Sequence, residues 1–371
     1  GSPLGMALFV VMLVAAGVVF VRLMTPRVKI LQVVGRSDRL GDWGARIAGV
    51  LKYFVGQGRI LDRKYRWVGL MHAMIFWGFL AVAINSVHFV GRGFYEHFAL
   101  PGFGPDGLLG NPYVFVRDLF EIAVVVMVVV AVVRRLVARP RRLTLSGDAI
   151  LILAMIGTLM ITDLGIAGVA SAASPDGLAE GYRSFAGTLF APLFASASDG
   201  TRVAMHAAMW WVHLGTLLFF LTYLPISKHF HVITSLPSVL FRRLDRGSLP
   251  KMDLENSETF GVVGFKDLGW KDVLDVYSCT ECGRCQEACP AYATGKPLNP
   301  KKINEDMREA LMPSLPFLLG KPAPEGWSEP ILPSETIADD VLWSCTTCRA
   351  CEQACPLFIE FIDRIVGMRR K

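Results

Sequence analysis

Five long apolar stretches are the feature that most restricts how this chain can fold. Each is long enough to cross the hydrocarbon core of a bilayer, which takes about twenty residues as a helix. In lipid the backbone must satisfy its own hydrogen bonds, so such stretches are expected to form membrane helices. The expected spans cover roughly residues 4–24, 67–90, 114–137, 148–172 and 202–224.

The composition agrees with a membrane protein. Of the 371 residues, 53% are hydrophobic and only 19% are charged. The formal net charge is +6, but Lys and Arg gather beside the apolar stretches and are not interleaved with aromatic side chains. Membrane topology explains this pattern, and nucleic-acid binding is not expected.

The basic loops predict the orientation of the spans. Lys and Arg are concentrated in loop 25–66, after the third span and after the fifth span, and are scarce in the other two loops. By the positive-inside rule the amino terminus is expected outside and the carboxy terminus in the cytoplasm. The predicted location is therefore the cytoplasmic (inner) membrane, with multiple passes.

The eight cysteines form two nearly identical motifs. Residues 279–290 read CTECGRCQEACP and residues 345–356 read CTTCRACEQACP, so each copy follows C-x2-C-x2-C-x3-C-P. With this spacing, three thiolates bind one [4Fe–4S] cluster and the fourth binds the other cluster. The predicted ligands are Cys279, Cys282, Cys285 and Cys355 for the first cluster, and Cys345, Cys348, Cys351 and Cys289 for the second.

Structural zinc and disulfides are the alternatives for these cysteines. Zinc sites use two ligand pairs separated by an open stretch, whereas here four cysteines crowd together twice. Disulfides are rare in the reducing cytoplasm, where the topology places both motifs. Two cubane clusters are therefore the favoured interpretation.

Histidines in the apolar stretches predict a second kind of cofactor. A polar ring inside a bilayer is costly, and neutral imidazole is a common axial ligand of haem iron. On one continuous helix His213 and His231 would lie about 27 Å apart on the same face, and His72 and His88 lie about 24 Å apart. This pairs His72 with His231 near the cytoplasm and His88 with His213 farther out, which fits two b haems.

One angle counts against the second haem. Sixteen helical residues turn through about 160° beyond whole turns, so His72 and His88 need not face the same partner. A kink, a helix crossing or a single haem are the alternatives, with His206 as another possible outer ligand. A membrane histidine can also simply be hydrogen-bonded to a neighbouring helix.

The segment from His213 to His231, HLGTLLFFLTYLPISKHFH, resembles the last helix of the respiratory nitrate reductase gamma subunit, a five-helix dihaem quinol oxidase. His72, within GLMHAMIFWG, is similar to that family's inner ligand on helix two. The family's outer ligand on that helix would fall at Val82, which cannot bind iron. His88 then has to substitute for it.

Fusion of such a bundle to a twin-cubane module resembles the heterodisulfide-reductase-related membrane oxidoreductases, most of all electron-transfer-flavoprotein:menaquinone oxidoreductase. The linking sequence GKPLNPK at 295–301 is similar to the helical ferredoxin module of that group. The resemblance implies an all-α membrane protein with three parts. They are a five-helix transmembrane haem b domain at 1–235, a connector at 236–276 and an α-helical ferredoxin-like domain at 277–371.

The resemblance also implies a function. Electrons from a soluble donor such as electron transfer flavoprotein pass through two [4Fe–4S] clusters and b haem to menaquinone. Reverse flow from quinol to a cytoplasmic disulfide, sulfite or nitrate reductase is the first alternative, and a non-catalytic anchor and conduit is the second. Members of the group usually carry cysteine-rich CCG domains, which a longer chain or a separate subunit is expected to supply.

Quinone reduction consumes protons, so ionisable groups are expected around its pocket. In the outer leaflet the candidates are Glu121, Asp163 and His206, with Arg117 and Asp118 at the rim. An interhelical hydrogen bond is the structural alternative for the carboxylates Glu121 and Asp163. The chain has no P-loop and no G-x-G-x-x-G after a strand, so bound nucleotide or flavin is not expected.

Shorter segments are also predicted. Residues 43–57 form either an interfacial helix or a linker helix, and residues 303–311 form a helix ahead of two prolines. A surface loop is expected at 318–336 and a basic-ended helix at 357–370. Residues 247–258 are expected to be the loosest part of the connector.

Overall fold

The computed structural model describes residues 2–245, 248–249, 252, 255 and 260–371. Within these ranges the chain is helical and has isolated bridges but no strands, so the predicted all-α class is confirmed. Most of the stretch 247–258 lies outside the described residues.

The chain divides into two compact units. Unit 1 comprises Gly1–Phe20, Arg63–Arg139 and Leu145–Tyr223, and unit 2 comprises Val21–Asp62, Pro140–Thr144 and Leu224–Lys371. Helix α1 (Pro3–Val33) contributes residues to both units.

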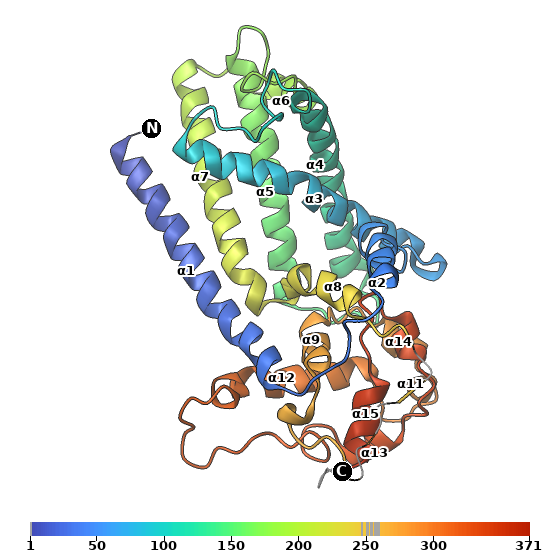
Figure 1. Ribbon diagram of the computed structural model, residues 1–371. Helices are drawn as coiled ribbons and strands as arrows, with labels where there is room; N and C mark the ends of the chain where they lie inside the picture. The colour runs from blue at the N-terminus through green and yellow to red at the C-terminus, as the bar shows by residue number, and fades with distance from the viewer. Residues whose placement is uncertain (1, 246–247, 250–251, 253–254, 256–259) are drawn as a thin grey trace. The chain divides into compact units, whose positions relative to one another are not determined.

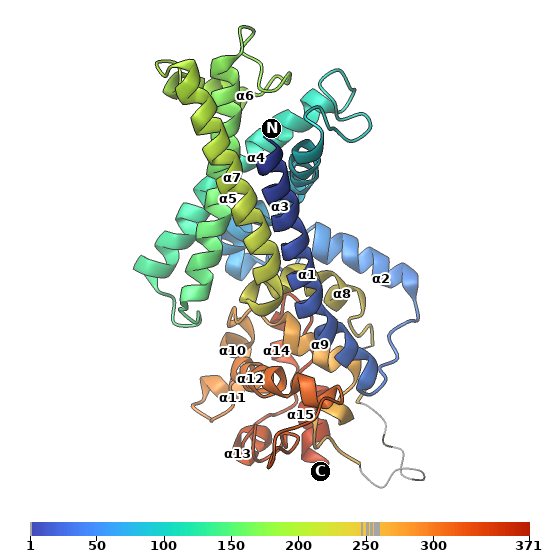
Figure 2. The ribbon, with the colours of Figure 1, turned by 90° about the vertical axis from the view of Figure 1, so that its left-hand side faces the viewer.

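Unit 1 is built from long helices. They are α3 (Arg66–Phe94), α4 (Gly110–Val133), α5 (Gly147–Ala173) and α7 (Asp199–Tyr223), with the short α6 at Phe185–Phe190. Helix α5 packs against α4, α6 and α7, and α3 packs against α4. Figures 1 and 2 both show α5 beside α7. A Cβ atom at Gly78 of α3 would lie 2.4 Å from the Val124 side chain, so glycine permits the close approach of α3 to α4.

Four helical segments among the described residues are long and apolar enough to cross a membrane. They are Pro3–Val33, Arg63–Phe94, Gly147–Ala173 and Asp199–Ile226. They agree with four of the five predicted spans and fit a membrane protein. The remaining predicted span corresponds to α4, which carries three charged residues, Arg117, Asp118 and Glu121, within its first half.

Helix α7 ends earlier than the sequence led us to expect. It stops at Tyr223, two 3-10 turns follow at Leu224–Ile226 and Lys228–Phe230, and α8 begins at His231. Pro225 explains the break, because proline has no N–H and its ring clashes with the preceding helical turn. The assumption that His213 and His231 share one continuous helix was therefore wrong.

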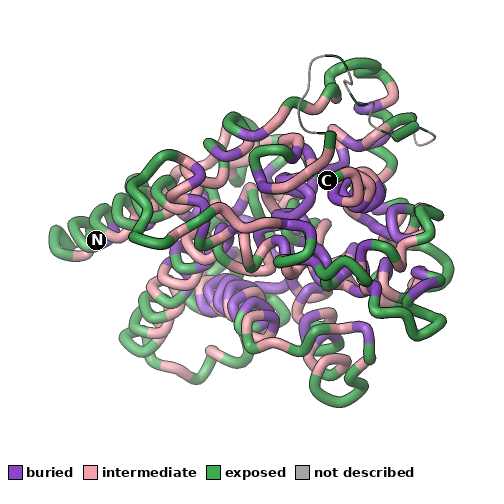
Figure 3. Tube along the Cα trace, turned by 90° about the horizontal axis from the view of Figure 1, so that it is seen from below, coloured by how far each residue is buried: buried purple, intermediate pink, exposed green. Residues whose placement is uncertain are grey.

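Unit 2 is a set of short helices around one hydrophobic core. Its helices are α2 (Trp43–Gly49), α8 (His231–Leu240), α9 (Trp270–Ser278), α10 (Arg284–Ala288), α11 (Pro290–Ala293), α12 (Pro300–Leu318), α13 (Asp339–Trp343), α14 (Ala350–Ala354) and α15 (Ile362–Arg369). Ile30 of α1 and Val34, the residue after that helix, join this core with Phe265, Met307 and Phe361. Figure 3 shows purple buried coils near the carboxy terminus, with green exposed loops around them.

Several predicted segments differ in length from the observed helices. The predicted helix 303–311 is part of α12, which continues through Pro313 and Pro316 to Leu318. The predicted helix 357–370 begins only at Ile362, because Phe358 has a left-handed φ of 58° that helical backbone cannot adopt. Over residues 43–57 helix α2 is followed by a π-helical segment, Val50–Val55.

Candidate iron–sulfur centres and polar cavity

The two cysteine motifs adopt the same backbone turns. Glu281 and Gly283 in the first copy have φ of 55° and 74°, and the equivalent Thr347 and Arg349 have φ of 56° and 60°. Left-handed backbone costs an L-residue roughly 1–2 kcal/mol. Its recurrence at matching positions indicates that each loop is constrained into one shape, just before the short helices α10 and α14.

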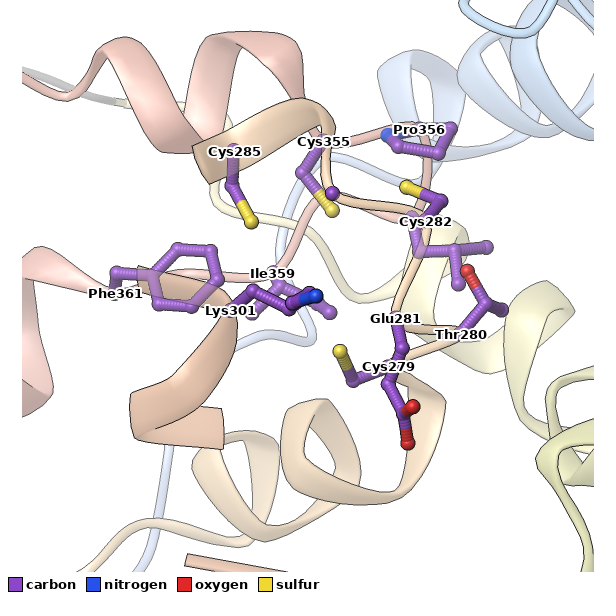
Figure 4. A pocket seen from close by; sticks show the side chains of 12 residues that line it. Cys279, Thr280, Glu281, Cys282, Cys285, Lys301, Cys355, Pro356, Ile359 and Phe361 are labelled. Carbon is purple, nitrogen blue, oxygen red and sulfur yellow. The ribbon is translucent and has the colours of Figure 1, made fainter. Parts of the chain in front are cut away.

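The structure brings together the four cysteines predicted as the first set. Cys279, Cys282, Cys285 and Cys355 line one small cavity, although the last belongs to the second motif. Figure 4 shows their sulfur atoms around this cavity, together with the side-chain nitrogen of Lys301. The fourth cysteine of this quartet therefore comes from the other motif, in the arrangement that a C-P ending favours.

The chemistry of this donor set fits a metal cluster. Burial, together with the smaller effect of neighbouring thiols, raises the pKa of Cys279 to about 11 and that of Cys355 to about 12. Burial also raises the pKa of Cys285, as do Cys279, Cys282 and Cys355. Three of the four crowded thiols are buried, and Cys282 is half-buried. Such thiols lose their protons only when a cation takes up the charge, which is what bound metal does.

The second predicted set is also gathered. Burial raises the pKa of Cys345, and the nearby Cys289 and Cys348 raise it further. The pKa of Cys351 is raised by burial, then by Glu352, Cys345 and Cys289. Cys289 of the first motif thus lies among the thiols of the second. Cys348 is exposed, whereas Cys289 and Cys351 are buried.

The spacing of these groups differs from that of a single-ion site. Among the described residues, no three His, Cys, Asp or Glu side chains are arranged to hold one metal ion. A cubane is larger than one ion and takes its four thiolates at separate corners. Both cysteine quartets suit such a ligand.

Basic side chains and a neighbouring loop surround the first quartet. Arg59 donates to the Cys355 carbonyl oxygen at 2.6 Å, and Arg284 donates to the carbonyl oxygens of Arg59 and Ile60 at 2.6 and 3.0 Å. Glu281 forms ion pairs with Lys228 and Arg308. From the sequence, Arg59 and Lys228 were assigned only to membrane topology. No local motif predicts their contacts with the cysteine loops, because the partners lie far apart in the chain.

Two of the predicted haem ligands have oriented imidazole rings. His213 Nδ1 lies 2.9 Å from the Thr162 hydroxyl, and His231 Nδ1 lies 2.9 Å from the Lys228 carbonyl oxygen. A histidine that binds metal usually donates its other ring N–H to such an oxygen, so both rings have this arrangement. His213 is buried and its ring packs on Phe89.

The other two predicted ligands differ. His88 Nε2 accepts a hydrogen bond from the Leu100 backbone N–H at 3.2 Å, so iron at this nitrogen would require that N–H to move. The His88 ring lies against Phe103 and Tyr113. His72 lies on α3 in unit 1, half-buried.

Unit 1 contains a cavity of about 470 Å³. Asp163 and His206, two of the three quinone candidates, line it, and so does Arg117. Asn85 donates to Asp163 at 2.6 Å, and Arg117 donates to Asn85 at 3.2 Å. This chain of contacts links α3, α4 and α5 at one side of the cavity.

Glu121 and Asp118, also singled out from the sequence, are not among the residues that line the cavity. Both are fully buried, Arg117 donates to Asp118 at 2.8 Å, and a 3.3 Å ion pair joins Arg117 to Glu121. The ion pair of Glu121 lies within α4, whereas the structural alternative predicted for this carboxylate was a hydrogen bond between helices.

Sequence reasoning missed two carboxylates at the cavity, Glu96 and Glu180. Glu180 forms an ion pair with Arg92, and its other oxygen lies 3.9 Å from His206 Nε2. It lies in the loop between α5 and α6, where no motif marks it. Only the fold places it with Arg92 and His206.

Comparison with known proteins agrees with this description of the cysteines. Residues 278–359 match the 4Fe-4S dicluster domain. The chain is 33% identical to the EtfAB:quinone oxidoreductase of Syntrophomonas wolfei, over 91% of this chain and 50% of that protein. It is 30% identical to the probable iron-sulfur-binding oxidoreductase FadF of Bacillus subtilis, over 98% of this chain and 55% of that protein.

Shorter matches extend the comparison. The chain is 33% identical to a subunit of the ferredoxin:CoB-CoM heterodisulfide reductase of Methanosarcina mazei, over 26% of this chain and 46% of that protein. The chain spans about half the length of the Syntrophomonas and Bacillus relatives. No solved structure matches it significantly. The resemblance predicted from the sequence is confirmed.

Proposed function

We propose that this chain, an iron–sulfur oxidoreductase related to EtfAB:quinone oxidoreductase and to a subunit of heterodisulfide reductase, carries electrons between a soluble protein and a membrane quinone. The observation that carries the proposal is the gathering of eight cysteines into two quartets with exchanged fourth members. When bound there, two [4Fe–4S] clusters supply one-electron transfer.

The exposure of the two quartets supports an order of electron transfer. Cys348 of the second quartet is exposed and Cys345 is half-buried, so a soluble protein can approach this quartet closely. Cys279, Cys285 and Cys355 of the first quartet are buried. Electrons therefore enter at residues 345–351 and pass to the quartet of residues 279–285. The proposed donor is electron transfer flavoprotein, the class of partner in the name of the Syntrophomonas relative.

We further propose that b haem continues the route within the apolar helices. His213 and His231 carry the support, because each ring is held through Nδ1 by an oxygen, as is usual for a metal-binding histidine. His72 remains the proposed partner of His231, and His88 or His206 that of His213. The location proposed for the helices is the cytoplasmic membrane, with the cluster domain in the cytoplasm.

The 470 Å³ cavity is the proposed menaquinone site. A quinone takes up two electrons and two protons to become a quinol, so its pocket needs groups that hold and pass protons. Asp163, His206 and Glu180 are available there, and Arg117 and Asn85 keep Asp163 in place. The route proposed for protons runs from Glu180 and His206 towards Asp163.

A redox titration of the purified full chain tests the cofactor content. Followed by visible and EPR spectra, it should show b-type haem bands and two [4Fe–4S] signals, with about eight non-haem iron atoms per chain. Far fewer iron atoms or the absence of haem bands would overturn the corresponding part of the proposal.

A variant pair tests the quinone site. Asp163→Asn should lower turnover of a soluble menaquinone analogue at least tenfold while both cluster signals remain. Asp199→Asn, a change at an exposed carboxylate at the start of α7, should leave turnover unchanged. If both variants turned over the analogue at the same rate, the protons would reach the quinone by a route that does not include Asp163.

Similarity to a subunit of heterodisulfide reductase favours a second candidate function. In it, quinol is oxidised and electrons leave through the exposed second quartet to a cytoplasmic reductase. Mixing the oxidised chain with reduced electron transfer flavoprotein separates the two directions, since rapid cluster reduction supports the first and its absence supports the second. For either direction of electron flow, a cysteine-rich CCG domain or subunit is a proposed partner. If the chain shows no quinone turnover, the proposed role is that of a non-catalytic anchor and electron conduit.

A further inference from the structure

The ammonium group of Lys301 faces the first cysteine quartet. Lys301 lies in the first turn of α12, is 9% exposed and lines the same cavity as the four thiols. Figure 4 shows its nitrogen in the space between the sulfur atoms of Cys279 and Cys285. A charged amine is costly to bury. The position of Lys301 beside four thiols, which would be anionic thiolates in a bound cluster, therefore requires an explanation.

A short segment, residues 140–144, holds the lysine there. Lys301 Nζ donates to the Thr144 hydroxyl at 3.1 Å and to the Arg142 carbonyl oxygen at 3.4 Å. A Cβ atom at Gly283 would lie 2.4 Å from the same Arg142 oxygen. The segment therefore packs against both the first cysteine loop and the lysine that faces it.

The lysine adds a cation to the first quartet beyond what the two quartets share. Arg308 donates to the Cys279 carbonyl oxygen, and Arg369 donates to the equivalent Cys345 carbonyl oxygen, so each first cysteine has one arginine. Lys301 is close to the first quartet in addition. The nearest carboxylate to its ammonium is that of Glu305, 4.0 Å away, which offsets part of the charge.

We propose that Lys301 raises the reduction potential of the cluster bound by Cys279, Cys282, Cys285 and Cys355, which makes that cluster the acceptor for electrons arriving from the exposed one. Reduction adds one negative charge to a thiolate-bound cluster, and a nearby cation stabilises the reduced form. The effect is large in a buried site, because interactions between charges are screened less there than in water. This inference rests on the cluster assignment of the proposed function but not on its quinone site.

The test is a redox titration of the full chain in detergent, followed by EPR. Lys301→Met should lower one of the two cluster potentials by about 59 mV or more, a tenfold change in equilibrium constant for one electron. Lys301→Arg should restore most of the shift, because it keeps the charge. The other cluster potential should stay at its wild-type value in both variants.

Lys302 provides the matched control. It is the next residue on α12, and its exposed side chain pairs with Asp306. Lys302→Met should leave both potentials unchanged. An equal shift in Lys302→Met, or unchanged potentials in Lys301→Met, would overturn the inference.

A second pair of variants, Lys301→Gln and Lys301→Arg, keeps the test valid if Lys301→Met does not retain the cluster. Lys301→Gln keeps hydrogen-bonding capacity without the charge, so its potential should lie below that of Lys301→Arg. Equal potentials in the Gln and Arg variants would also overturn the inference. Absence of two cluster signals in the wild type would instead refute the cluster assignment, so the two failures are distinguishable.

Discussion

The two cysteine motifs have nearly the same sequence and backbone, yet their surroundings differ. Both have left-handed residues at the same two positions, and both first cysteines receive an arginine at the carbonyl oxygen. Around the first motif lie Lys301 and the segment 140–144. The second motif has an exposed cysteine, Cys348.

This difference shows that two copies of a motif can share the same cysteine positions and still have different neighbouring residues. Ligand geometry follows from local spacing, which both copies share. Potential and access depend on the charge and solvent around the ligands, which other parts of the chain supply. The two centres are therefore expected to have different roles. The second quartet is expected to receive electrons from a soluble partner, and the first to pass them on towards the apolar helices.

The fourth ligands give the largest expected effect. Cys355→Ser should remove the same EPR signal as Cys279→Ser, although the two residues belong to different motifs, and non-haem iron should fall by about half. Cys289→Ser should in turn match Cys345→Ser. If Cys355→Ser instead removed the signal lost in Cys345→Ser, each motif would hold its own cluster and the exchange would be wrong.

Oxidative damage should separate the two centres by exposure. With ferricyanide and a chelator, the second cluster should be lost several times faster than the first, because Cys348 is exposed and Cys279 is buried. The loss can be followed by EPR of samples taken over time and reduced again. Equal rates would mean that the burial difference does not control access.

The Gly283 position tests the packing around the first motif. Gly283→Ala should destabilise unit 2 by at least the roughly 1–2 kcal/mol of left-handed backbone, because φ is 74° and the new Cβ would lie 2.4 Å from the Arg142 oxygen. Arg349→Ala is the matched control at the equivalent position, where an L-residue already has φ of 60°. The midpoint of thermal cluster bleaching measures both. A smaller loss in Gly283→Ala than in Arg349→Ala would contradict the packing described.

Asp272 gives the smallest expected effect, on the α9 helix that leads into the first motif. Burial raises the pKa of Asp272 to about 6 from its ordinary 3.8, and Asp275 adds to the rise while Arg364 opposes it. The folded state therefore holds the proton more tightly than the unfolded state, so stability falls as pH rises from about 4 to about 6. Because the side chain is 22% exposed, the fall should be on the order of 1 kcal/mol.

Asp272→Asn should remove this pH dependence. Thermal bleaching midpoints of the wild type and the variant, measured at several pH values between about 4 and 7, provide the comparison. Parallel curves would show that another group is responsible.

Much of the architecture could be predicted from local patterns. Four apolar stretches agree with helices fit to cross a membrane, because about twenty apolar residues leave the chain few other options. The cysteine spacing predicted a 4Fe-4S dicluster domain for the same local reason. Helix boundaries were less predictable, since Pro225 ended α7 while Pro313 and Pro316 did not end α12.

The sequence by itself determined the two cysteine motifs and the apolar helices, because both depend on residues close together in the chain. Only the tertiary structure decided that Arg59, Lys228 and Lys301 lie around the cysteine quartets, and that Arg117 pairs with Asp118 and Glu121 inside unit 1. It also placed Glu180 at the cavity beside His206. Apart from the pairs within α4, these are contacts between distant segments. A buried charge takes whichever partner the fold brings near, which local spacing does not encode.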